Sequence, residues 1–174
     1  MPNNNEPRLS DYWKRPERKS KGQGMRIVFE ESPTPEDLQV LENGIVEHGR
    51  STIGTWGHNP LAFFLRDKDN SIAGGIYGNS GFGWLYISDL WVASKLRGKG
   101  YGSQLIKSAE QEGVKRGCRN VFLNTFSFQA LEFYQKLGYY VFAELEDFPQ
   151  HHFRYFLRKE LSETSINDPQ NRTK

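Results

Sequence analysis

Apolar and polar positions along this chain follow two periods, one typical of strands and the other typical of helices. Alternating or continuous apolar stretches predict strands near 26–30, 61–66, 72–77, 84–92, 120–124, 139–145 and 153–159. Segment 84–92 has apolar residues at successive positions, as a central strand with two covered faces does. The turn residues at 67–70 join two of the strands as a hairpin, and the glycines and proline of 51–60 predict a loop.

Three segments have apolar residues at helical spacing. The first follows Thr34 to Asp37, a pattern typical of a helix start, and its stripe is Leu38, Leu41 and Ile45. The second follows a glycine-rich turn, ends near Gly117, and has one apolar face, made of Leu105, Ile106, Ala109 and Gly113. In the third, Gly138 stops a helix whose apolar residues are Ala130, Phe133, Tyr134 and Leu137.

This order of elements predicts a mixed α/β (α+β) sheet flanked by helices. We expect one domain over residues 25–160. Residues 1–24 and 161–174 are polar and lack periodicity, so they are interpreted as disordered extensions. The first extension is basic, with six cationic and three anionic side chains, within a chain of net charge +2. Such a segment can touch nucleic acid or an anionic surface, or it can be a solvated tail, and nothing in the sequence requires a nucleic-acid partner.

Composition excludes several classes of protein. No apolar run approaches the about 20 residues that cross a bilayer, and the N-terminus has no secretory apolar segment. Cys118 is the only cysteine, which excludes an internal disulfide and a cysteine-rich metal site. We therefore expect a cytoplasmic protein without a membrane partner.

The candidate chemistry starts at a strand that leads through a glycine-rich turn into a helix. The strand ends with Leu90, Trp91 and Val92, and the turn is Arg97, Gly98, Lys99, Gly100, Tyr101, Gly102 and Ser103. Free N–H groups at a helix start form an anion site suited to a pyrophosphate, and Arg97 and Lys99 add positive charge. The dinucleotide and Walker patterns both fail here, and a purely structural turn is the alternative.

Two motifs at a suitable interval resemble the GNAT superfamily of acyl-CoA N-acetyltransferases. Arg97-x-x-Gly100-x-Gly102 is similar to the family's Arg/Gln-x-x-Gly-x-Gly/Ala signature. The segment from Ala130 to Tyr139 resembles the family's A-x-x-F-Y-x-K-x-G-[FY] segment. The resemblance covers about residues 25–160 and implies a GNAT-like fold, a central, mostly antiparallel sheet flanked by helices. It also implies acetyl-CoA as co-substrate and transfer of acetyl to a primary amine.

The resemblance also implies roles for individual residues. The amides of Gly98 to Gly102 would bind the pyrophosphate, Leu90 to Val92 would follow the pantetheine arm, and the Leu90 N–H would polarise the thioester carbonyl. Tyr134 matches the tyrosine that protonates the departing thiolate, although the alternative is a core aromatic. Ser127 stands where many members have a cofactor-binding asparagine, and its hydroxyl could still reach the cofactor.

The proton acceptor is the least defined role. An alkylamine of pKa about 10.4 must lose a proton at a cost of about 4–5 kcal/mol at neutral pH. Tyr86 stands where some members have a glutamate base, so Asp89 is the first candidate, with a solvated strand aspartate as the alternative. An acidic group, made of Glu144, Glu146 and Asp147, could attract a cationic amine or simply be solvated.

The remaining conspicuous residues suggest an acceptor pocket rather than a metal centre. His48, His58, His151 and His152 match no zinc spacing, so no metal is expected. The family places its acceptor pocket near the loop that contains Trp56 and His58, and His152 could line the same pocket. We expect a small-molecule amine, such as a cationic metabolite or an antibiotic. A protein acceptor, a longer acyl group and a non-catalytic acyl-CoA sensor are the alternatives. A homodimer is compatible with the resemblance.

Overall fold

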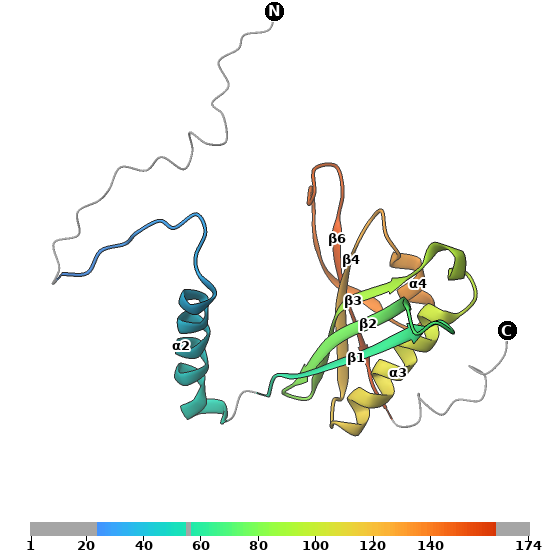
Figure 1. Ribbon diagram of the computed structural model, residues 1–174, viewed down its shortest axis with the longest axis horizontal. Coiled ribbons are helices and arrows are strands. Elements are labelled where there is room, and N and C mark those ends of the chain that lie inside the picture. The colour runs from blue at the N-terminus through green and yellow to red at the C-terminus, as the bar shows by residue number, and fades with distance from the viewer. Residues whose placement is uncertain (1–23, 55–56, 163–174) are drawn as a thin grey trace, which may run out of the picture. The chain divides into compact units, whose positions relative to one another are not determined.

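The computed structural model describes residues 24–54 and 57–162 (Figure 1). Most of the predicted N-terminal extension, the predicted C-terminal tail after Ser162, and Trp56 lie outside the described residues. The chain divides into two units, one up to Ile45 and one from Val46 onward. No helix of the described residues has the length and apolar composition to cross a membrane.

In the first unit, one prediction is wrong and another is confirmed. Residues 26–30 form no strand, and the side chains of Ile27 and Phe29 are exposed, because no strand within residues 24–54 and 57–162 pairs with this segment. Helix α2, Pro35–Ile53, begins as predicted, with the Asp37 amide donating to Thr34 Oγ1 at 3.2 Å. The helix crosses the boundary of the units and continues three residues into the predicted loop 51–60.

The second unit contains one six-stranded sheet in the order β1-β2-β3-β4-β6-β5. The strands are β1 Asn59–Arg66, β2 Ile72–Gly81, β3 Trp84–Val92, β4 Asn120–Phe126, β5 Tyr140–Leu145 and β6 Arg154–Glu160. Every neighbouring pair is antiparallel except β3 and β4, which are parallel. The mixed, mostly antiparallel sheet predicted from the sequence is therefore confirmed.

One face of this sheet is covered by two helices and contains the core (Figure 1). Helix α3, Tyr101–Lys115, buries the four predicted apolar residues Leu105, Ile106, Ala109 and Gly113. Helix α4, Leu131–Lys136, buries Tyr134 and ends in a Schellman turn, where the Tyr139 amide donates to the Tyr134 carbonyl at 3.1 Å. We call this the helix face.

The opposite face, which we call the open face, is rich in aromatic side chains. In β4 the buried Val121, Leu123 and Thr125 point to the helix face, so the alternate residues Phe122, Asn124 and Phe126 point to the open face. The register places Arg158, Phe156 and Arg154 of β6 beside those three residues, on the same face. The loop between β5 and β6 projects beyond the sheet on this unit (Figure 1).

Candidate active site

The glycine-rich turn forms a backbone anion site at the start of α3. A short 3-10 helix, Ser94–Leu96, leads into Gly98 and Gly100, whose φ angles of 73° and 82° are left-handed. Gly100 is the N-cap of α3, and no side chain caps the helix. Within the described residues, the amides of residues 98–103 donate to no acceptor. Six consecutive N–H groups at the positive end of a helix are therefore available to an anion.

Cationic and polar side chains surround this turn. Arg97 Nε donates to the Val92 carbonyl at 3.0 Å, which fastens the exposed Arg97 to the end of β3. Lys99 is exposed, and Tyr101 and Ser103 are partly buried at the first turn of α3. The predicted cofactor residues of the turn thus lie together around one set of free amides.

The two sequence motifs meet in space at Gly102. A Cβ atom on Gly102 would lie 3.2 Å from Cζ of Phe133, so a larger residue here would displace the Phe133 ring by a few tenths of an ångström. Because Phe133 precedes Tyr134 on α4, this contact sets the position of the predicted acid relative to the anion site. The sequence alone did not reveal this contact.

Tyr134 is buried and keeps its proton at neutral pH. Its ring makes edge contacts with Phe133 and Tyr139, at centroid distances of 5.1 and 5.9 Å. Desolvation by burial raises the pKa of Tyr134 to about 12. Its hydroxyl makes no hydrogen bond to the described residues, so it can donate to a ligand atom.

Strands β3 and β4 pair only over their first halves. The last parallel pair is Ile87 with Leu123, although β3 continues to Val92 and β4 to Phe126. The register of β3 with β2 shifts next to Ser88, which marks a bulge. Backbone groups of residues 88–92 that point away from β2 therefore have no partner strand. We call these segments, 88–92 and 124–126, the splayed ends.

The bulge determines which way the predicted catalytic residues of β3 point. Leu90 pairs with the buried Ile76 and packs against the core on the helix face. Asp89 and Trp91 therefore point to the open face, where both are exposed, and Val92 points to the helix face. The Leu90 amide and the Asp89 carboxylate thus come from successive residues of one splayed end.

A polar cluster on the open face was not predicted from the sequence. Asn124 Nδ2 donates to the Tyr86 hydroxyl at 3.5 Å, and Arg154 Nε donates to Asn124 Oδ1 at 2.9 Å. These three residues come from β3, β4 and β6, and we call them the open-face cluster. The only sequence signal for it is the alternation of arginine and phenylalanine at 154, 156 and 158.

A cavity of about 300 Å³ adjoins this cluster. Its lining residues are Gly57, His58, Asn79, Gly81, Phe82, Trp84, Tyr86 and Phe122. Tyr86 lines the cavity and stacks on Phe122, with a distance of 4.7 Å between the ring centroids. His58, predicted near the acceptor pocket, is part of this lining.

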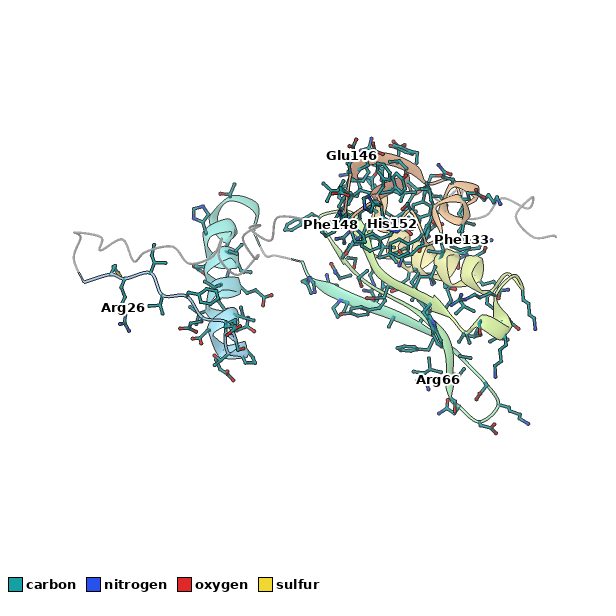
Figure 2. All side chains as sticks on the ribbon, turned by 90° about the horizontal axis from the view of Figure 1, so that it is seen from above. Arg26, Arg66, Phe133, Glu146, Phe148 and His152 are labelled. Carbon is teal, nitrogen blue, oxygen red and sulfur yellow. The ribbon has the colours of Figure 1, made fainter. Side chains whose placement is uncertain are left out.

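Ser127 and His152 lie together, although they are far apart in the sequence. Ser127 Oγ is 3.2 Å from His152 Nδ1 and accepts the Phe153 amide at 3.2 Å. The Phe148 amide donates to the His152 carbonyl at 2.9 Å, and Figure 2 shows both side chains in the β5–β6 loop. The Ser127 hydroxyl thus fixes this loop, and its contact with a cofactor remains a prediction.

Other candidate residues take no part in this arrangement. Cys118 is buried, and desolvation raises the pKa of its thiol, so no activated nucleophile is present there. In the acidic group, Glu144 and Glu146 are exposed and Asp147 accepts the His151 amide. No three His, Cys, Asp or Glu side chains of residues 24–54 and 57–162 form a metal-binding group.

Two known acetyltransferases are similar in sequence to more than half of this chain. An acetyltransferase of Agrobacterium fabrum is 30% identical over 66% of this chain and 84% of its own length. The blasticidin-S acetyltransferase of Streptomyces morookaense is 40% identical over 58% of this chain and 74% of its own.

Solved structures have the same fold. An acetyltransferase from Bacillus cereus superposes with a TM-score of 0.69 and 33% identity, over 77% of this chain and 98% of its own. An aminoglycoside 6'-N-acetyltransferase, solved with coenzyme A, has a TM-score of 0.53 and 21% identity over 60% and 74% of the two chains. The model of the acetyltransferase (GNAT) family matches residues 7–139, and the chain therefore belongs to that family.

Proposed function

We propose that this protein transfers an acetyl group from acetyl-CoA to a primary amine of a small molecule by direct attack. The observation that carries the proposal is the contact of Gly102 with Phe133, which joins the anion site of α3 to the helix that bears Tyr134. Acetyl-CoA supplies a pyrophosphate for the first site and a thioester for the second.

The cofactor side consists mainly of backbone groups. The amides of Gly98 to Ser103 would bind the pyrophosphate, with Arg97 and Lys99 adding charge. Leu90, Trp91 and Val92 would lie along the pantetheine arm, because the splayed end of β3 offers backbone groups without a partner strand. Ser127, near the end of β4, could donate its hydroxyl to the same arm.

Three groups would carry the chemistry. The Leu90 N–H would donate to the thioester oxygen and stabilise the negative charge that develops as the amine attacks. Asp89, on the open face, would accept the proton that the amine loses. Tyr134 would donate its proton, or a hydrogen bond, to the departing sulfur, and its pKa of about 12 keeps it protonated for this role.

The acceptor side favours a small molecule. The cavity of about 300 Å³ is lined largely by aromatic rings, which suits a compact amine better than an extended peptide. The blasticidin-S acetyltransferase relative is named for a small molecule, which agrees with this choice. A peptide or protein acceptor, a longer acyl group and a non-catalytic sensor are the rival functions.

The first experiment is calorimetric titration with acetyl-CoA, followed by a thiol-release assay over a panel of small amines and peptides. Binding together with thiol release by a small amine would support the proposal. Release only with peptides would favour the protein acetyltransferase, and binding without release would favour a sensor. Absence of binding would overturn the cofactor assignment.

A further inference from the structure

We propose that Arg154 forms an anion subsite that binds a carboxylate of the amine acceptor, so that the substrate is an amino acid or a similar carboxylated amine. This inference rests on the proposed function and narrows its substrate class. It depends on the surroundings of the Arg154 guanidinium, its lack of a counter-charge and its place beside the splayed ends.

Aromatic rings hold the guanidinium in place and partly remove it from water. The Arg154 guanidinium carbon lies 5.3 Å from the ring centre of Phe126, 5.7 Å from Phe148 and 5.6 Å from Phe156. These rings come from β4, the β5–β6 loop and β6, so three elements contact one side chain. Its Nε is occupied by Asn124 Oδ1, which sets the plane of the group.

No anionic side chain of the described residues neutralises this cation. Arg154 forms no ion pair there, and its two terminal NH₂ groups donate to no acceptor. By contrast, the partly buried Lys159 binds both oxygens of Glu110, each at 2.9 Å. A partly dehydrated, oriented guanidinium with two free NH₂ groups has the geometry that binds a carboxylate through two hydrogen bonds.

The register places this cation close to the proposed reaction centre. Arg154 pairs with Phe126 at the splayed end of β4, and β4 is the neighbour of β3, which bears Asp89. One to two strand spacings separate β6 from the splayed ends, which is about 5–10 Å. An amine several bonds from a carboxylate could therefore reach the splayed ends while its carboxylate binds Arg154. Tyr86 and Asn124 connect this subsite to the cavity.

The test compares ω-amino acids with alkylamines. We would measure kcat/KM for β-alanine, 4-aminobutanoate and 5-aminopentanoate against n-alkylamines of the same chain length, at saturating acetyl-CoA. The wild type should prefer at least one acid by about 10-fold or more. Arg154→Met should remove that preference, by lowering kcat/KM for the acid while changing that for the alkylamine by less than about 2-fold.

Two further variants separate recognition from structure. Arg158→Met removes the same charge from the same strand and face, where Arg158 contacts Tyr140 and Phe142, and should keep the preference for the acid. Asn124→Asp places a carboxylate beside Arg154 Nε without removing the ring contacts. It should abolish the preference as Arg154→Met does, because the internal anion occupies the subsite.

The possible failures differ from one another. Turnover of alkylamines and acids at equal rates by the wild type would overturn the subsite and leave the proposed acetyltransferase standing. Equal loss of both substrates in Arg154→Met, with a lower melting temperature, would show that Arg154 only holds the three rings. If no amine releases thiol, the proposed function fails, and calorimetric binding of 5-aminopentanoate to the CoA-loaded protein then decides about the subsite. Binding abolished by Arg154→Met would support it, and no binding would overturn it.

Discussion

The two sides of the splayed strands present different chemical groups, backbone amides on one and side chains on the other. On the helix face, the anion site consists of consecutive backbone amides at residues 98–103, which need only glycines and a helix start. On the open face, the cluster consists of side chains from three strands, held by hydrogen bonds and ring contacts. In the proposed function, one side would therefore recognise a ligand through the main chain, and the other through side chains that can change without altering the fold.

This difference explains why the proposed cofactor is easier to assign than the acceptor. A backbone site depends on conformation, so it leaves a short glycine pattern in the sequence. A side-chain site depends on the identities of distant residues, so each member can have a different one. Substitutions on each side can show whether the two sides are independent.

The largest expected effect is loss of acetyl-CoA binding in Gly100→Val. Valine is strained at a φ of 82°, and its methyl groups would occupy the space in front of the free amides, where the nearest atom to a Cβ is Gln104 Nε2 at 3.8 Å. We expect affinity to fall by about 100-fold or more, because the charge-assisted hydrogen bonds to the pyrophosphate are lost. Calorimetric titration measures this affinity for acetyl-CoA.

Gly117→Val is the matched control for this change. Gly117 has a φ of 81° beyond the other end of α3, with no atom within 4 Å of its Cβ position. This variant carries the same backbone strain away from the anion site, so it should bind acetyl-CoA normally. Normal binding by both variants would show that the glycine turn is not the cofactor site.

The next effect is expected in Asp89→Asn, which removes the proposed proton acceptor on the open face. We expect the acetylation rate at pH 7 to fall by about 100-fold, in the range for loss of a general base, with acetyl-CoA affinity unchanged. The deficit should narrow as the pH approaches about 10.4, where the free amine no longer needs a base.

Asp69→Asn, in the exposed turn between β1 and β2, is the control for loss of one negative charge. A pH-independent deficit in Asp89→Asn would argue against proton transfer to Asp89. An unchanged rate would remove Asp89 from the mechanism and leave the base to be sought elsewhere on the open face.

A smaller effect, about 10-fold or more in kcat, is expected in Tyr134→Phe. The ring packing against Phe133 and Tyr139 would stay, while the hydroxyl that is proposed to donate to the sulfur is lost. Tyr139→Phe is the control, because its hydroxyl donates to Glu110 at 2.9 Å and not to a ligand. That variant should lose stability by about 1 kcal/mol and keep its kcat.

The pKa of Tyr134 adds a pH test to the same variant. Because burial raises the pKa to about 12, the phenol stays protonated as the pH rises from 7 to 10. The wild-type rate should therefore not fall between pH 7 and 10 through ionisation of this phenol. The contrary result would be a fall in the wild type that is absent from Tyr134→Phe. Such a fall would mean that the phenol ionises near its ordinary pKa, in contradiction to its burial.

The sequence predicted local features well and contacts between strands poorly. Helical spacing predicted the buried residues of α3, which are Leu105, Ile106, Ala109 and Gly113. Gly138 was predicted to end the third helix, and it follows α4. The strand at 26–30 was wrong, because apolar composition does not supply a pairing partner. The contact of Gly102 with Phe133 and the open-face cluster depend on packing and register, which local periodicity does not contain.

The smallest effect, and the finest test of independence, is expected in Tyr86→Phe. The variant keeps the ring that stacks on Phe122 and lines the cavity, but removes the oxygen that accepts from Asn124 at 3.5 Å. A long hydrogen bond of this kind contributes about 0.5–1 kcal/mol, so the acceptor KM should rise by about 2- to 5-fold. Tyr77→Phe is the control, because Tyr77 lies on the open face of the neighbouring strand β2. Acetyl-CoA affinity should be unchanged in both variants, and a parallel loss of it in Tyr86→Phe would mean that the two sides of the splayed strands are energetically coupled.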